Sequence, residues 1–343
     1  MVLYIHFGIY KAGSSYIQYY CANNKYYLLE NNIYFPPSDQ DEKMKAGLIS
    51  AGNALRLSKA LKTSDQKKIE AVLTDWYSGA VKHNTDSVLI SSEALVHDLA
   101  IKNKIELLIN LCHKTGFTEI KAMGFFRDLA DHALSTYKHR AKTGRHPDYE
   151  HWIKHNYETP ELLKNLAQTV EATEKKIEWN LRKFQKDSEF LKQAFFEDWL
   201  GIASPVFNEK PTVNESLTLS EVKLMNHLKK THPFSIDYFV NGFKALSKQQ
   251  KAKDKDLEKY VIIKFFEVLK IHICTLDKIN VFFLKGERIQ ISENIPIEKT
   301  IREPDIRLSE EQLEIISNHI LFFNSFAGYK VVCGRRLLKF LKG

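Results

Sequence analysis

The chain opens with Val2-Leu3-Tyr4-Ile5-His6-Phe7-Gly8-Ile9-Tyr10-Lys11-Ala12-Gly13-Ser14-Ser15, and this stretch decides the fold. Residues 2–7 form an apolar run of strand length, and a helical pattern begins near Ser14. A strand that enters a helix through a glycine-containing turn presents backbone N–H groups and the positive end of the helix dipole. The pattern therefore predicts a phosphate-binding loop within an α/β fold.

The spacing of this loop is close to the P-loop pattern G-x-x-x-x-G-K-[ST] and differs from it at the lysine. Gly8, Gly13 and Ser15 occupy pattern positions, but Ser14 stands where the lysine is expected and Lys11 lies inside the loop. A P-loop lysine reaches the outer phosphates of a triphosphate. A lysine three residues earlier is expected to contact a nearer phosphate and its bridging oxygen. A generic phosphate loop and an unliganded strand–helix turn remain open at this point.

A second apolar run, residues 119–126, ends at Arg127 and is followed by a helical pattern to about residue 142. Ser135 lies two helical turns into that pattern. An arginine binds phosphate oxygens with two N–H donors, and a hydroxyl group adds a further donor. Arg127 and Ser135 are therefore candidates for a second phosphate site. The alternative is an arginine paired with an aspartate at a helix start, followed by a mid-helix serine.

A third apolar run, residues 87–91, leads into the polar sequence Ser91-Ser92-Glu93. A carboxylate at the end of a strand can act as a general base, so Glu93 is the first candidate for proton abstraction. A glutamate at a helix start capped by Ser91 or Ser92 fits the same sequence. His97, one helical turn later, is the reserve candidate. His6 is expected to be a buried strand histidine.

The loop resembles the 5′-phosphosulfate loop of sulfotransferases, enzymes that take a sulfuryl group from 3′-phosphoadenosine-5′-phosphosulfate (PAPS). The family form is K-T-G-T-T or K-T-G-S-S, and Ala12 departs from its threonine. The spacing of Arg127 and Ser135 is similar to the 3′-phosphate site of the family, and S-S-E segments like the one at Glu93 occur in its bacterial and glycan-modifying members. The resemblance covers most of the chain, most closely over residues 1–36 and 87–142.

The resemblance implies an in-line transfer of the sulfuryl group from PAPS to a hydroxyl group of a carbohydrate or glycolipid. Lys11 would stabilise charge on the bridging oxygen, and Glu93 or His97 would accept the proton. The expected nucleotide-binding residues are Lys11, Ala12, Gly13, Ser14, Ser15, Arg127 and Ser135. No metal is expected. A P-loop-type kinase and a non-catalytic saccharide-binding relative are the two alternatives.

The apolar runs, separated by helical patterns, predict an α/β fold with a P-loop-like parallel sheet flanked by helices. A further short strand is expected at 33–36 and a later strand at 177–184, whereas the alternation around Lys285-Gly286 predicts a hairpin over 281–291. We expect residues 1–202 to form the PAPS-binding core. Residues 203–343 are expected to be a mostly helical remainder that completes the same domain and the acceptor cleft.

Composition narrows the class of protein further. The formal net charge of +8 suits an anionic ligand, and no nucleic-acid-binding signature is present, so nucleic acid is not an expected partner. The four cysteines are scattered and form no zinc or redox pattern. The first strand starts without a basic leader, and no apolar run has membrane-spanning length, which predicts a cytoplasmic enzyme.

The last fourteen residues, 330–343, carry five basic side chains and no acidic one. They could form a packed terminal helix, an anion-binding wall, or a peripheral contact with a membrane surface. The sequence leaves these three interpretations open, together with the oligomeric state and the identity of the acceptor.

Overall fold

The structure is a computed structural model that describes residues 1–142, 148–205, 217–231, 236–292 and 303–325. The chain divides into two compact units, each assembled from three segments. The first unit comprises Met1–Leu129, Glu158–Val213 and Ile271–Ile291, and the second comprises Ala130–Tyr157, Asn214–Lys270 and Ser292–Gly343. Each unit therefore draws on residues from both sides of position 202, where the sequence suggested a boundary.

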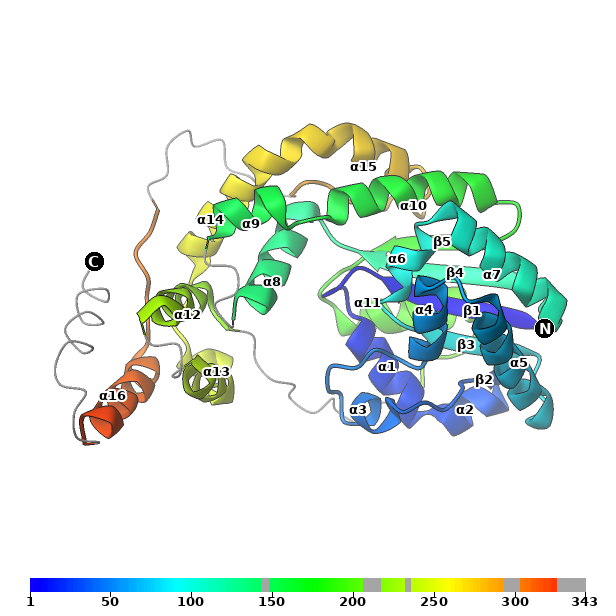
Figure 1. Cartoon of the computed structure of the whole chain (residues 1–343), viewed down its shortest axis with the longest axis horizontal. Helices are drawn as coiled ribbons and strands as arrows, with labels where there is room; N and C mark the ends of the chain where they lie inside the picture. Colours follow the sequence, from blue (N-terminus) through cyan, green and yellow to red (C-terminus); the bar gives the residue numbers. More distant parts are fainter. Residues whose placement is uncertain (143–147, 206–216, 232–235, 293–302, 326–343) are drawn as a thin grey trace. The chain divides into compact units, whose positions relative to one another are not determined.

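A five-stranded parallel sheet forms the centre of the first unit, in the order β2-β3-β1-β4-β5 (Figure 1). The strands are β1 (Val2–Gly8), β2 (Ile33–Tyr34), β3 (Ser87–Ser91), β4 (Glu119–Phe126) and β5 (Glu178–Lys183). The sequence predicted all five strands, and the structure confirms an α/β fold with a P-loop-like parallel sheet flanked by helices.

The central strand β1 lies between β3 and β4, with His6 beside Ser91 on one side and Met123 on the other. Ligands of open α/β sheets bind beyond the carboxyl ends of the strands. The segments that follow β3, β1 and β4 are therefore neighbours at the edge of the sheet where a site is expected. These segments begin at Ser92, Ile9 and Arg127 respectively.

The helices of the first unit connect and flank these strands (Figure 1). Apolar side chains on their inner faces and on the strands make up the core, in which Leu3, Ile5 and Phe7 are fully buried. A π-helical segment, Gln193–Trp199, follows α11. The helices are α1 (Ser14–Asn23), α2 (Lys25–Glu30), α3 (Asp41–Lys45), α4 (Leu55–Lys62), α5 (Gln66–Lys82), α6 (Leu95–Leu99), α7 (Lys102–Thr115), α10 (Thr159–Thr173), α11 (Ser188–Lys192) and α15 (Ile273–Asn280).

The second unit is helical in its described part. Its core includes Trp152, whose ring lies 5.6 Å from that of Tyr137 and 6.0 Å from that of Phe265. The helices are α8 (Leu129–Ala141), α9 (Tyr149–His155), α12 (Leu219–Thr231), α13 (Ile236–Ala245), α14 (Lys255–Leu269) and α16 (Glu310–Ser325).

Capping boxes begin two of these helices. The Thr218 backbone N–H donates to the Glu221 carboxylate, and the Glu221 N–H donates to the Thr218 hydroxyl. Ser309 and Gln312 make the same reciprocal pair before α16. Each pair satisfies N–H groups that a helix start leaves without a partner.

The hairpin predicted over residues 281–291 is wrong. An isolated parallel bridge joins Phe283 to Leu181, and Gly286 turns the chain with φ of 91°. The Asn280 side chain donates to the Ile289 carbonyl and accepts the Ile289 N–H, both at 2.9 Å. Because a side chain satisfies these backbone groups, the segment does not pair with itself as a hairpin would.

None of the helices in the described ranges is long and apolar enough to cross a membrane. The basic segment 330–343 lies outside the described residues.

Candidate functional site

The loop between β1 and α1 has the backbone geometry that its glycines predicted. Gly13 has φ of 90° and caps α1, because its carbonyl accepts the Tyr16 N–H at 2.9 Å. A Cβ atom at Gly13 would lie 2.8 Å from Phe184 Cε2, so no larger residue fits without displacing that ring. Lys11 is itself left-handed, with φ of 64°, a conformation that is strained for a residue with a side chain.

Arg127 lies directly after β4 and contacts this loop. Its guanidinium Nη1 donates to the Lys11 carbonyl oxygen at 3.2 Å, and its Cζ lies 5.4 Å from the centre of the Phe184 ring. The structure therefore brings two predicted site residues together although 116 positions separate them in the sequence. The contact also stabilises the left-handed backbone at Lys11.

Glu93 follows β3 and reaches the same region. Burial raises the pKa of its carboxyl group from 4.5 to about 7, while the nearby Ser14 hydroxyl and the positive charge of Lys11 oppose the rise. A carboxyl group with a pKa near 7 exchanges protons readily at neutral pH, which is the property of an efficient general base. Lys11, Ser14 and Glu93 thus form one cluster beyond the ends of β1 and β3.

Ser14 supplies a buried polar group at the start of α1. Ser14 is 1% exposed, and its hydroxyl lies close enough to the Glu93 carboxyl to lower the pKa of that group. A buried hydroxyl of this kind at a helix N-terminus fits an anionic oxygen. Ser15 is half-buried beside it, whereas the Ala12 side chain is fully buried in the core.

His6 and His97 have different surroundings. His6 is fully buried and shares a 2.8 Å hydrogen bond between its Nδ1 and Ser91 Oγ; burial lowers its pKa to about 3. It is therefore neutral at physiological pH, and the prediction of a buried strand histidine is confirmed. His97 is exposed on α6, and its ring centre lies 6.2 Å from that of Tyr10.

Ser135 lies in α8 and belongs to the second unit, where it is half-buried. Its partnership with Arg127, which belongs to the first unit, stays a prediction.

Asn53 also lies close to the site, although no sequence pattern indicated it. Asn53 is 2% exposed, and its side chain hydrogen-bonds to the backbone of Leu89 and Ser91 in β3, just upstream of Glu93. Gly52-Asn53 has the composition of an ordinary turn, and its contact with β3 arises from tertiary structure.

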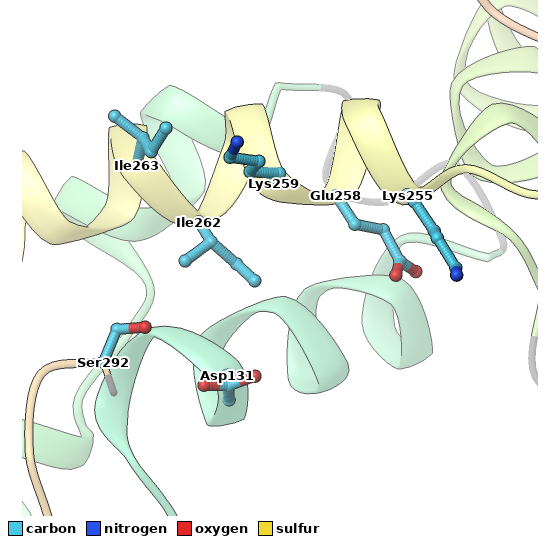
Figure 2. A pocket seen from close by; sticks show the side chains of 7 residues that line it. All are labelled: Asp131, Lys255, Glu258, Lys259, Ile262, Ile263 and Ser292. Atoms are coloured by element: carbon cyan, nitrogen blue, oxygen red, sulfur yellow. The ribbon is translucent and has the colours of Figure 1, made fainter. Parts of the chain in front are cut away.

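The second unit has a separate hollow of about 310 Å³, lined by side chains of α8 and α14 and by Ser292 (Figure 2). Its lining side chains include both acidic and basic groups, and Glu258 also pairs with Lys138 at 2.7 Å. None of the predicted site residues lines this hollow. The lining residues are Asp131, Lys255, Glu258, Lys259, Ile262, Ile263 and Ser292.

No family model, curated protein or solved structure matches this chain. Its function must therefore be inferred from the chemistry of the site.

Proposed function

We propose that this protein is a PAPS-dependent sulfotransferase that acts on a hydroxyl group of a carbohydrate or glycolipid. One observation carries the proposal. A lysine, an arginine and a carboxyl group of raised pKa gather around a helix N-terminus at the carboxyl ends of three adjacent strands. These residues are Lys11, Arg127 and Glu93, and the sequence alone indicates each of them as a site candidate.

The donor-binding part of the proposal rests on the start of α1. The N–H groups of Ser14 and Ser15, the Ser14 hydroxyl and the Lys11 ammonium suit a 5′-phosphate. Arg127, with Ser135 as the partner predicted from the sequence, would bind the 3′-phosphate. PAPS supplies the activated sulfuryl group, and the protein contributes orientation and charge neutralisation.

The positions of Lys11 and Glu93 support the following transfer step. An oxygen–sulfur bond forms to the acceptor hydroxyl while the bond from sulfur to the 5′-phosphate oxygen breaks. Glu93 accepts the proton of the hydroxyl group. Lys11 stabilises the charge that develops on the leaving phosphate oxygen. His97 remains the second candidate for the base, and its exposure favours a role at the acceptor side.

Tyr10 and His97 mark the side from which we propose that the acceptor enters. Tyr10 is 40% exposed and directly precedes Lys11. Its ring presents an apolar face with a polar edge, a surface suited to a sugar ring. A cytoplasmic location and a peripheral membrane contact through residues 330–343 are part of the same proposal.

Isothermal titration with adenosine-3′,5′-bisphosphate tests the donor site. We expect micromolar binding by the wild-type protein and a loss of at least about tenfold in Arg127→Ala, because a charge-assisted phosphate contact is removed. Arg56→Ala is the matched control, since Arg56 is an exposed arginine of the same unit that pairs with Asp75. Its affinity should equal that of the wild type.

The result also separates the alternatives. Magnesium-dependent binding of ATP in place of the bisphosphate would favour a P-loop-type kinase. Bisphosphate binding without transfer from labelled PAPS to any member of a saccharide and glycolipid panel would favour a non-catalytic relative. In the presence of an accepted substrate, Lys11→Ala should lower turnover by orders of magnitude with a smaller loss of bisphosphate affinity.

A further inference from the structure

On one edge of β3, the partner strand β2 is too short to pair along its whole length. The two-residue strand β2 pairs with it only at Ser87 and Val88. Further along that edge, the Leu89 carbonyl and the Ser91 N–H and carbonyl need partners, because buried backbone groups are nearly always hydrogen-bonded. These are the last backbone groups of the strand before Glu93.

The side chain of Asn53 fills this gap. Its Oδ1 accepts the Ser91 N–H at 2.7 Å, and its Nδ2 donates to the Leu89 carbonyl at 3.2 Å. The Ala54 N–H then donates to the Ser91 carbonyl at 3.4 Å. One acceptor and two donors thus occupy the places where a longer β2 would continue the parallel ladder.

Asn53 and Ala54 can approach β3 closely because the residue before them, Gly52, has no side chain. Gly52 has φ of 74°, and a Cβ atom there would lie 1.9 Å from the Ser91 carbonyl oxygen. Asn53 itself is almost fully buried, and its Nδ2 also lies 3.4 Å from the Pro36 carbonyl oxygen. The segment is therefore held tightly against the end of the strand.

The same segment is attached to α1 at its other end. The Ser50 hydroxyl donates to Gln18 Oε1 at 2.6 Å, and Gln18 lies one helical turn after Ser14 on α1. Both Ser14 and Gln18 are 1% exposed. Residues 50–54 therefore connect the helix that carries Ser14 to the strand that leads to Glu93.

We propose that Asn53 is a positioning residue that holds Ser91-Ser92-Glu93 against the Lys11 loop. Its catalytic consequence rests on the proposed sulfotransferase function, since Asn53 acts through Glu93 and contacts no reacting atom. Loss of the Asn53 amide frees the end of β3, lets Glu93 move towards water and away from Lys11 and Ser14, and weakens the proton acceptor.

The titration of Glu93 measures this role directly. In protein labelled with ¹³C at the glutamate carboxyl carbon, NMR should show a carboxyl group that titrates near pH 7, and Glu93→Gln identifies it by removing its signal. In Asn53→Ala we expect the midpoint to fall by about one pH unit or more, because exposure to water favours the carboxylate. An unchanged midpoint in folded Asn53→Ala would overturn the proposal.

Asn280→Ala is the matched control. Asn280 also accepts one N–H and donates to one carbonyl, both of Ile289, so its loss removes the same kinds of bond as the loss of the contacts between Asn53 and β3. A merely structural asparagine should lower stability and leave the Glu93 midpoint in place. A shift of the midpoint in Asn280→Ala as large as in Asn53→Ala would therefore also contradict a specific role for Asn53.

A second measurement applies if Asn53→Ala does not fold. In the wild-type protein, hydrogen exchange at the Ser91 amide should be slow, because Asn53 Oδ1 accepts that N–H. Exchange at the rate of an exposed loop amide would overturn the proposal. Failure of the wild type to bind the bisphosphate would instead refute the sulfotransferase function, and the titration would still decide the role of Asn53.

Discussion

Replacing Glu93 by glutamine removes a carboxyl group whose ionisation is opposed by burial, while it keeps the size and shape of the side chain. In the unfolded chain this group has an ordinary pKa of 4.5, and in the folded protein its pKa is about 7. Because the folded pKa is the higher one, the stability associated with the neutral carboxyl is fully present below pH 4.5. It is lost as the pH rises through 7.

The magnitude follows from these two values. They differ by about 2.5 pH units, and each unit corresponds to about 1.4 kcal/mol. Between pH 5 and pH 8.5, Glu93 should therefore reduce the free energy of unfolding of the wild-type protein by about 2 to 3 kcal/mol. Glu93→Gln has no such group, so its stability should depend less on pH by the same amount.

Urea denaturation of both proteins at pH 5 and pH 8.5 gives the difference of differences, in which the contributions of all other titrating groups cancel. The transition should be followed by a probe of the first unit, which contains Glu93. If the stability of the two proteins depended equally on pH, the pKa of Glu93 would be the same in the folded protein as in the unfolded chain. That result would remove the basis for treating this residue as a base poised at neutral pH.

Three further predictions test the candidate site and the packing of the first unit. Lys11→Met should raise the pKa of Glu93 above 7 in a ¹³C NMR titration, because the positive charge of Lys11 lowers it; a lower or unchanged pKa would place the ammonium elsewhere. Gly13→Ala should destabilise the protein by about 1 to 3 kcal/mol in urea denaturation and weaken bisphosphate binding, because the positive φ and the crowded Cβ position both oppose a side chain. If the variant kept the stability and affinity of the wild type, that would contradict the observed loop geometry. Arg182→Met should lower the free energy of unfolding by about 3 to 5 kcal/mol in urea denaturation, because the largely buried carboxylate of Glu287 loses its guanidinium partner at 2.7 Å. A loss below about 1 kcal/mol would show that water replaces the ion pair.

Local sequence was sufficient to predict the sheet and the glycine turn between β1 and α1. The apolar runs that became β1, β3 and β4 are long enough to be recognised as buried strands. Glycine spacing located the turn at Gly13, because few residue types tolerate its backbone conformation. Lys11 and Glu93 were selected because polar residues that follow buried strands lie at the edge of the sheet where ligands bind.

The same local reasoning failed where long-range contacts decide the structure. Residues 281–291 have the alternation of a hairpin, yet Asn280 and β5 satisfy their polar groups. Asn53 has the appearance of a turn residue, but its side chain completes the edge of β3. Neither outcome can be derived from a window of neighbouring residues, because the partners come from distant parts of the chain.

The sequence by itself determined which segments become strands and helices, and it determined the left-handed turn before α1. These features depend on backbone sterics and on hydrophobic periodicity, which act between near neighbours. Only the tertiary structure decided that Arg127 contacts the Lys11 loop and that burial raises the pKa of Glu93 to about 7. Hydrogen bonding and desolvation in the site are set by groups from several elements, and folding alone brings those groups together.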